Sequence, residues 1–218
     1  MTAFLLCVVA LISYSFGSLS SPILMSHIYF HENILNYSRD NVGITRFVKH
    51  HGRKGVVLLL GFEALKTAIP VGISGLLMLI VGHADVGFAF ALFCVVLGTN
   101  FPILYRFRGE PSLVAVAVGS IFVSGELTLA GVFVFIIVYI VSRYVSLSAI
   151  VAMLFMCLVA AMSMDMLVVR NLVLLIGLLV LIEYRHSIVR LFKGKEKKFW
   201  YKKDITYMFD DDYGTGEK

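Results

Sequence analysis

Short polar side chains, glycine and three cations gather in residues 36–49 of a chain that is otherwise strongly apolar. The candidates for binding an anion in this segment are Ser38, Asn41, Gly43, Thr45 and Lys49. Main-chain N–H groups that a glycine leaves accessible, with Arg or Lys nearby, are the donors that a phosphate group needs. The segment therefore predicts a phosphate-binding loop, and a solvated basic loop is the alternative.

A second candidate is the charge pair Glu63 and Lys66, which lies within an apolar stretch. Residues three apart share one face of a helix, where opposite charges can neutralise each other. Because charges are costly in apolar surroundings, the pair also suggests a polar cavity facing the interior of a helix bundle. A purely structural ion pair is the alternative.

A third polar segment begins with Asn100 and Pro102 and continues through Arg108 and Gly109. Proline ends or kinks a helix and frees main-chain groups there. The glycine-bearing turn then leads into apolar residues, which is similar to the anion-binding N-terminus of a helix. We therefore expect Asn100, Arg108 and Gly109 near a bound anion.

Motifs of soluble metalloenzymes and hydrolases are missing from the sequence, which has no HExxH, CxxC or GxSxG. His50 and His51 are adjacent rather than at ligand spacing, so we expect no metal site and no cofactor. The cysteines lie in apolar runs and are expected to be small buried hydrophobes. They are Cys7, Cys94 and Cys157.

The composition excludes a soluble domain. Of 218 residues, 59% are hydrophobic and 15% charged, and the mean hydropathy is +0.90, whereas soluble domains are about 45–50% apolar and about 25% charged. Disorder and a disulfide-stapled secreted module are excluded as well. Because runs such as 132–141 do not alternate, we expect an all-α polytopic membrane protein rather than a barrel.

Seven apolar segments are long enough to cross a membrane as packed helices. Their expected bounds are 3–25, 56–81, 86–105, 112–124, 127–142, 147–164 and 168–184. The fourth and fifth could form one helix, but the carboxylate of Glu126 beside Gly125 favours a turn. With the N-terminus outside and the C-terminus cytoplasmic, every net basic loop lies inside, as the positive-inside rule requires.

The chain divides into a membrane domain, 1–190, and a basic then acidic cytoplasmic tail, 191–218, that we expect to be partly disordered. The border segment 183–190 contains Ser187. Its Arg and Tyr side chains are typical of a helix end anchored at a membrane surface.

The order and spacing of these segments resemble the bacterial acyl-phosphate:glycerol-3-phosphate acyltransferases, which are small seven-helix membrane enzymes. The family's Gly-Ser in the first span is similar to Gly17-Ser18. Its loop Gly-Ser-Gly-Asn-x-Gly-Ala-Thr-Asn-x-x-Arg is similar to 38–49, and its Asp-x-x-Lys-Gly is similar to 63–67. Its Gly-His-x-Phe-Pro, its Phe-Lys-Gly-Gly-Lys-Gly, its Arg-Tyr-Val-Ser-Leu and its closing Arg-His/Asn-Ile-x-Arg-Leu are similar to 98–102, 107–112, 143–147 and 185–191.

Several positions depart from the family pattern. The loop has Arg39, Arg46 and Lys49 where the family has Ser, Asn and Arg; Thr99 replaces a His; and Glu110, Pro111 and Ser112 replace Gly, Lys and Gly. Pro111 removes one charge and one N–H donor, and Glu110 adds a repulsive carboxylate unless Arg108 pairs with it. By the family's rule this turn is a poor phosphate cradle.

The resemblance implies acyl transfer from an acyl phosphate to glycerol 3-phosphate or a related polar acceptor, at the cytoplasmic face of the bacterial inner membrane. Positioning and phosphate electrostatics would carry catalysis. Expected partners are these anionic substrates and membrane lipid, not nucleic acid. The substrate-binding residues that we expect are Ser38, Asn41, Gly43, Thr45, Lys49, Lys66, Asn100, Arg108, Gly109 and Ser187.

Two alternatives stay open at this point. A catalytically degenerate paralogue could act as a binding or accessory subunit with a protein partner. A small transporter is a weaker alternative, because it would predict repeats and broken helices, and the sequence has no internal repeat.

Overall fold

The structure is a computed structural model that describes residues 1–30, 44–103, 109 and 112–192, and all regular structure in these residues is helical. The helices are α1 (Thr2–Gly17), α2 (Ser21–Phe30), α3 (Ile44–Leu79), α4 (Ala84–Asn100), α5 (Leu113–Val123), α6 (Gly125–Ser142), α7 (Val145–Ser163), α8 (Leu167–Glu183) and α9 (Arg185–Phe192).

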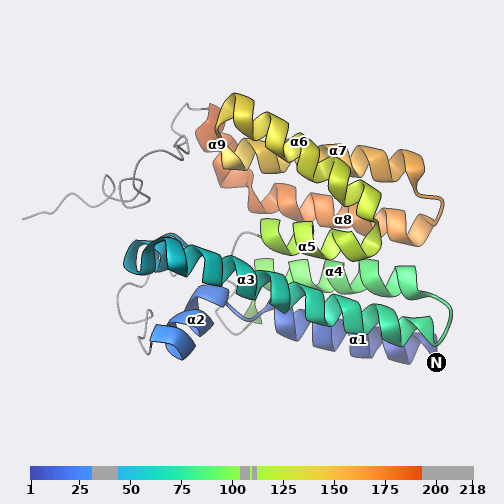
Figure 1. The fold of residues 1–218 in the computed structure, drawn as a ribbon. Coiled ribbons are helices and arrows are strands. Elements are labelled where there is room, and N and C mark those ends of the chain that lie inside the picture. The colour runs from blue at the N-terminus through green and yellow to red at the C-terminus, as the bar shows by residue number, and fades with distance from the viewer. Residues whose placement is uncertain (31–43, 104–108, 110–111, 193–218) are drawn as a thin grey trace, which may run out of the picture.

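The bundle is built around α4, which packs against α1, α3, α5 and α8 (Figure 1). Its inner face is fully buried at Val95 and Val96. Small residues let its neighbours approach closely, because a Cβ added at Gly17 would lie 2.3 Å from the main-chain oxygen of Val95. Close packing of small residues is the usual way in which membrane helices associate.

Among the described residues, three helical segments are long and apolar enough to cross a membrane: Val57–Leu79 within α3, α6 and α7. α1, α4 and α5 are shorter apolar helices. Large apolar side chains cover the outside, and Leu11, Leu129 and Val141 are at least 70% exposed. Such a surface suits lipid rather than water. The prediction of a helical, multi-pass membrane protein is therefore confirmed.

The expected first span, 3–25, is wrong, because two helices occupy it. α1 ends at Gly17, and the hydroxyl of Ser18 donates to the main-chain oxygens of Tyr14 and Ser15 at 2.8 and 3.2 Å. α2 then begins at Ser21. Pro22 is the second residue of α2, where its missing N–H costs nothing.

The expected second span, 56–81, agrees with Val57–Leu79, the part of α3 that is apolar enough to cross a membrane. α3 itself begins earlier, at Ile44, and α2 ends at Phe30. Both helices therefore extend into residues 26–55, which lie between the first two predicted spans. The remaining helices α4 to α8 overlap the third to seventh predicted spans.

The predicted turn between the fourth and fifth apolar segments is confirmed. Ser124 is extended and separates α5 from α6, and its hydroxyl accepts from the N–H of Leu127. Glu126 in the first turn of α6 is exposed.

The prediction for the cysteines holds in part. Cys94 is buried and Cys157 is half-buried, but Cys7 is exposed. The predicted burial of Cys7 is wrong, because Cys7 lies on the outward face of α1 with Phe4 and Leu11, which are three and four residues away along the helix.

Candidate functional site

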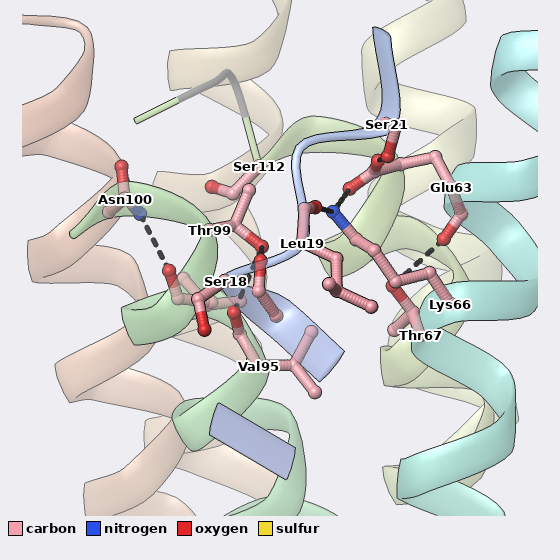
Figure 2. Close-up of polar contacts among 12 residues, drawn as sticks. Ser18, Leu19, Ser21, Glu63, Lys66, Thr67, Val95, Thr99, Asn100 and Ser112 are labelled. Carbon is pink, nitrogen blue, oxygen red and sulfur yellow. Dashed lines mark hydrogen bonds and ion pairs between the residues drawn. The ribbon is translucent and has the colours of Figure 1, made fainter. Parts of the chain in front are cut away.

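The polar segments of the described chain come together at the end of the bundle opposite the N-terminus (Figure 1). The C-termini of α1, α4 and α8 and the N-terminus of α5 lie at this end, beside the middle of α3. Side-chain hydrogen bonds connect these segments across the sequence (Figure 2). The site is therefore assembled by the packing of distant helices.

The charge pair on α3 is buried and holds the turn between α1 and α2. Lys66 Nζ lies 2.9 Å from Glu63 Oε1 and donates to the main-chain oxygen of Leu19 at 3.0 Å. The hydroxyl of Ser21 donates to the second carboxylate oxygen of Glu63. The predicted ion pair is confirmed, and it positions the residues that join α1 to α2 (Figure 2).

A polar cavity of about 10 Å³ lies beside Lys66. Its lining residues are Gly17, Ser18, Leu19, Ser20, Lys66, Thr99 and Pro102. This volume accommodates about one water molecule. An ammonium has three N–H groups. One donates to Leu19, and the ammonium is ion-paired with Glu63, so it still has donor capacity for a ligand in the cavity.

A larger, open groove of about 370 Å³ adjoins the polar cavity, since Ser18 and Leu19 line both. The rest of its lining is mainly apolar and comes from Tyr14, Ser15, Phe16 and Ile103. The Tyr14 hydroxyl donates to the main-chain oxygen of Phe101 at 2.7 Å. A polar cavity and an apolar groove therefore lie side by side at the end of α1.

Thr99 joins α4 to the end of α1. Its buried hydroxyl lies 2.9 Å from the main-chain oxygen of Val95 and 3.3 Å from that of Gly17. Thr99, which stands where the family has a histidine, thus binds main-chain oxygens through its hydroxyl.

A second polar junction joins the ends of α4, α5 and α8. The N–H and the hydroxyl of Ser112 donate to the two carboxylate oxygens of Glu183 at 3.0 and 2.5 Å. The Asn100 side chain near this junction donates to the main-chain oxygen of Val96 at 3.1 Å. Gly109 lies against the same place, because a Cβ there would be 2.1 Å from the main-chain oxygen of Asn100.

Sequence reasoning missed Ser112 and Glu183 as site residues. A carboxylate at the end of an apolar span is costly unless it has partners, and that cost was the available signal. Its partner could not be identified, because Ser112 is 71 residues away in the sequence.

The structure places part of the predicted set. Lys66 lines the cavity, and Asn100 and Gly109 lie together at the second junction. Thr45 and Lys49 lie in the first two turns of α3, and Ser187 lies in the first turn of α9. The other predicted residues fall outside the described residues; they are Ser38, Asn41, Gly43 and Arg108. In the described part of the chain, no three His, Cys, Asp or Glu residues are grouped to hold a metal ion.

Comparison with known proteins identifies the fold and the family. The family model described as "Glycerol-3-phosphate acyltransferase" matches residues 7–194. Glycerol-3-phosphate acyltransferase of Francisella tularensis subsp. novicida is 30% identical over 87% of this chain and 91% of its own length. That of Cupriavidus pinatubonensis is 27% identical over 90% and 97%.

Two crystal structures of PlsY, an integral membrane glycerol 3-phosphate acyltransferase, share this fold. The glycerol 3-phosphate form matches with a TM-score of 0.75 and 24% identity, over 89% of this chain and 96% of that one. The lysophosphatidic acid form matches with a TM-score of 0.74 and 23% identity, over 89% and 95%. The resemblance inferred from the motifs is confirmed, and the chain belongs to the glycerol-3-phosphate acyltransferase family.

Proposed function

We propose that this protein transfers an acyl group from an acyl phosphate to glycerol 3-phosphate, which yields lysophosphatidic acid and inorganic phosphate. The observation that carries the proposal is the adjacency of the Lys66 cavity and the apolar groove, which share Ser18 and Leu19. A fatty acyl phosphate has an apolar chain joined to an anionic head. The groove suits the chain, and the Lys66 cavity, which has room for about one water molecule, marks the polar end of that groove.

The reaction needs little covalent chemistry from the protein. A hydroxyl oxygen of glycerol 3-phosphate attacks the acyl carbon, the bond from that carbon to the phosphate oxygen breaks, and the leaving phosphate takes the hydroxyl proton. Two anions must be held together for this step, so positioning and charge neutralisation carry the rate. Glu63 already balances the charge of Lys66, so Lys66 offers a hydrogen-bond donor, and the net positive charge is proposed to come from Lys49 and Arg108.

The roles that we propose follow the order of the segments. Loop residues bind the phosphate of glycerol 3-phosphate; these are Ser38, Asn41, Gly43, Thr45 and Lys49. The donor phosphate lies toward Arg108 and Gly109, and Asn100, Lys66 and Ser187 complete the substrate contacts. Apolar residues of α1 flank the acyl chain.

The site end of the bundle is proposed to face the cytoplasm of a bacterium, with the protein in the inner membrane. α1 and α3 to α8 would be seven spans, with the N-terminus outside. Arg143, between α6 and α7, lies at the site end, whereas Asp85 and Glu126 begin helices at the other end. This distribution supports the orientation through the positive-inside rule. Residues 1–190 would form the membrane domain and 191–218 the cytoplasmic tail.

The test is turnover by the purified protein in detergent. Palmitoyl phosphate and glycerol 3-phosphate are supplied and phosphate release is followed, with a family member that has the intact glycine-rich turn as positive control. We expect turnover by the wild type, and its loss in Lys49→Ala and in Arg108→Ala. Arg170→Ala is the matched control, because Arg170 lies near the start of α8 at the opposite end.

The same assay separates the enzyme from an accessory subunit. Silence of the wild type beside an active control would contradict the proposed reaction. In that case the chain uses another substrate or acts as an accessory subunit. For an accessory subunit, changes in lipid-facing or tail residues would disturb a partner, whereas Lys49→Ala would leave lipid synthesis untouched.

A further inference from the structure

The carboxylate of Glu183 is bound at the N-terminus of α5. Both of its oxygens accept hydrogen bonds from Ser112, one from the N–H at 3.0 Å and one from the hydroxyl at 2.5 Å. Ser112 is fully buried, so these two hydrogen bonds are shielded from water. The carboxylate is therefore held where the main-chain N–H groups that open α5 are concentrated.

The position of Glu183 on its own helix does not explain this carboxylate. Glu183 is the last residue of α8, and the C-terminus of a helix carries partial negative charge that disfavours a carboxylate. The N-terminus of α5 carries the opposite partial charge and lies against it. The favourable electrostatic environment of the Glu183 carboxylate therefore comes from the N-terminus of α5.

The N-cap residue of α5 does not cap the helix with its own side chain, and Glu183 provides the anion at this position. Ser112 is the N-cap, yet its side chain does not cap its own helix. Its hydroxyl donates its proton to Glu183 instead. The preceding Pro111 has no N–H, so Ser112 supplies the N–H that a carboxylate or a phosphate would seek at this point.

We propose that Glu183 is a specificity-determining residue, a built-in anion that occupies the N-terminus of α5 and opposes binding of a phosphate group there. This inference rests on the proposed function for its meaning in catalysis. A substrate phosphate must displace the carboxylate or bind toward the Lys66 cavity, where Glu63 is already paired. The wild type therefore binds phosphate more weakly than the same donors would without the Glu183 carboxylate.

The test measures binding of inorganic phosphate to the purified full chain in detergent, by thermal unfolding at constant ionic strength. Glu183→Gln keeps an acceptor for Ser112 and removes the charge. We expect it to bind phosphate about two- to fivefold more tightly than the wild type, the range that charge–dipole effects at helix ends typically give. Structural damage alone would not produce tighter binding.

The matched control is Glu126→Gln, because Glu126 is an exposed carboxylate in the first turn of α6. It removes the same charge from the protein and should bind phosphate like the wild type. If Glu183→Gln does not fold, Glu183→Met replaces it, since it keeps a side chain of similar length, removes the charge and leaves both Ser112 donors for phosphate; it should also tighten phosphate binding.

Unchanged or weaker phosphate binding in the folded variant, or an equal gain in Glu126→Gln, overturns the inference. Phosphate binding is read without turnover. A gain in Glu183→Gln therefore supports the inference even if the wild type has no acyltransferase activity, and the failures of the two proposals are distinguishable.

Discussion

The ammonium of Lys66 donates to the main-chain oxygen of Leu19 at 3.0 Å, which ties α3 to the turn between α1 and α2. The same ammonium neutralises Glu63 at 2.9 Å. One buried cation thus maintains both the shape of the cavity and the charge balance around it.

Lys66→Met should destabilise the protein strongly. The substitution keeps an apolar side chain of similar length but leaves the Glu63 carboxylate buried without its cation, which costs about 3–5 kcal/mol. Thermal unfolding of the purified protein in detergent measures the loss.

The control for Lys66→Met is the double variant Glu63→Gln/Lys66→Met. It removes both charges and should recover most of the lost stability, because Gln still offers an acceptor to Ser21. Equal losses in the single and double variants would show that the uncompensated charge is not the cause.

The sequence was sufficient for some features of the fold and not for others. Apolar length located α4 to α8, and the cost of a buried carboxylate placed the break before Glu126. Hydropathy could not find the break at 18–20, because apolar residues continue on both sides of it. It also could not find the start of α3, because a polar helix outside the apolar layer has no hydropathy signal.

The candidate site, like the fold, was predictable from the sequence only in part. Glu63 and Lys66 were predictable as a pair because they interact across one helix turn. Ser112 and Glu183 were not, because their contact depends on how α5 and α8 pack around α4. Local spacing predicts local contacts, and contacts between distant helices require the fold.

Gly17→Ala should destabilise the bundle by about 1–3 kcal/mol, because overpacking forces neighbouring atoms apart. Its Cβ would lie 2.3 Å from the main-chain oxygen of Val95, and main chain cannot yield as a flexible side chain can. A lower unfolding midpoint is the measured result. Gly61→Ala is the control, since nothing lies within 4 Å of a Cβ there, and it should be neutral or slightly stabilising. Equal effects of the two variants would contradict the close approach of α1 and α4.

Thr128→Val tests the packing of α6 against α5. The Thr128 hydroxyl lies 2.9 Å from the Ser120 hydroxyl, across the break at Ser124. Hydrogen bonds between membrane helices contribute about 0.6 kcal/mol on average, so a loss of that size is expected in the free energy of unfolding. Ser142→Ala is the comparison, because the Ser142 hydroxyl makes local contacts instead: it donates to the Val138 oxygen at 2.7 Å and accepts from the N–H of Tyr144 at 3.3 Å. Its loss should cost less than that of Thr128. A larger loss in Ser142→Ala would contradict the interhelical role of Thr128.

Gly109→Ala should reduce catalysis much more than stability. A Cβ at Gly109 would lie 2.1 Å from the main-chain oxygen of Asn100 and 2.7 Å from that of Thr99, so the segment must move away from the end of α4. Gly109 is itself exposed, and its displacement leaves the buried core intact. Misplacement of site residues by about 1 Å can cost about a hundredfold in rate. We therefore expect kcat/KM to fall by about that factor while the unfolding midpoint stays close to the wild type.

Gly125→Ala is the matched control for Gly109→Ala, because Gly125 is also exposed and has nothing within 4 Å of an added Cβ. Gly125 begins α6 at the end of the bundle away from the site, so this variant should keep full turnover. Full turnover in Gly109→Ala would show that catalysis does not need the close approach of Gly109 to α4. The proposed place of the donor phosphate beside Gly109 would then be wrong.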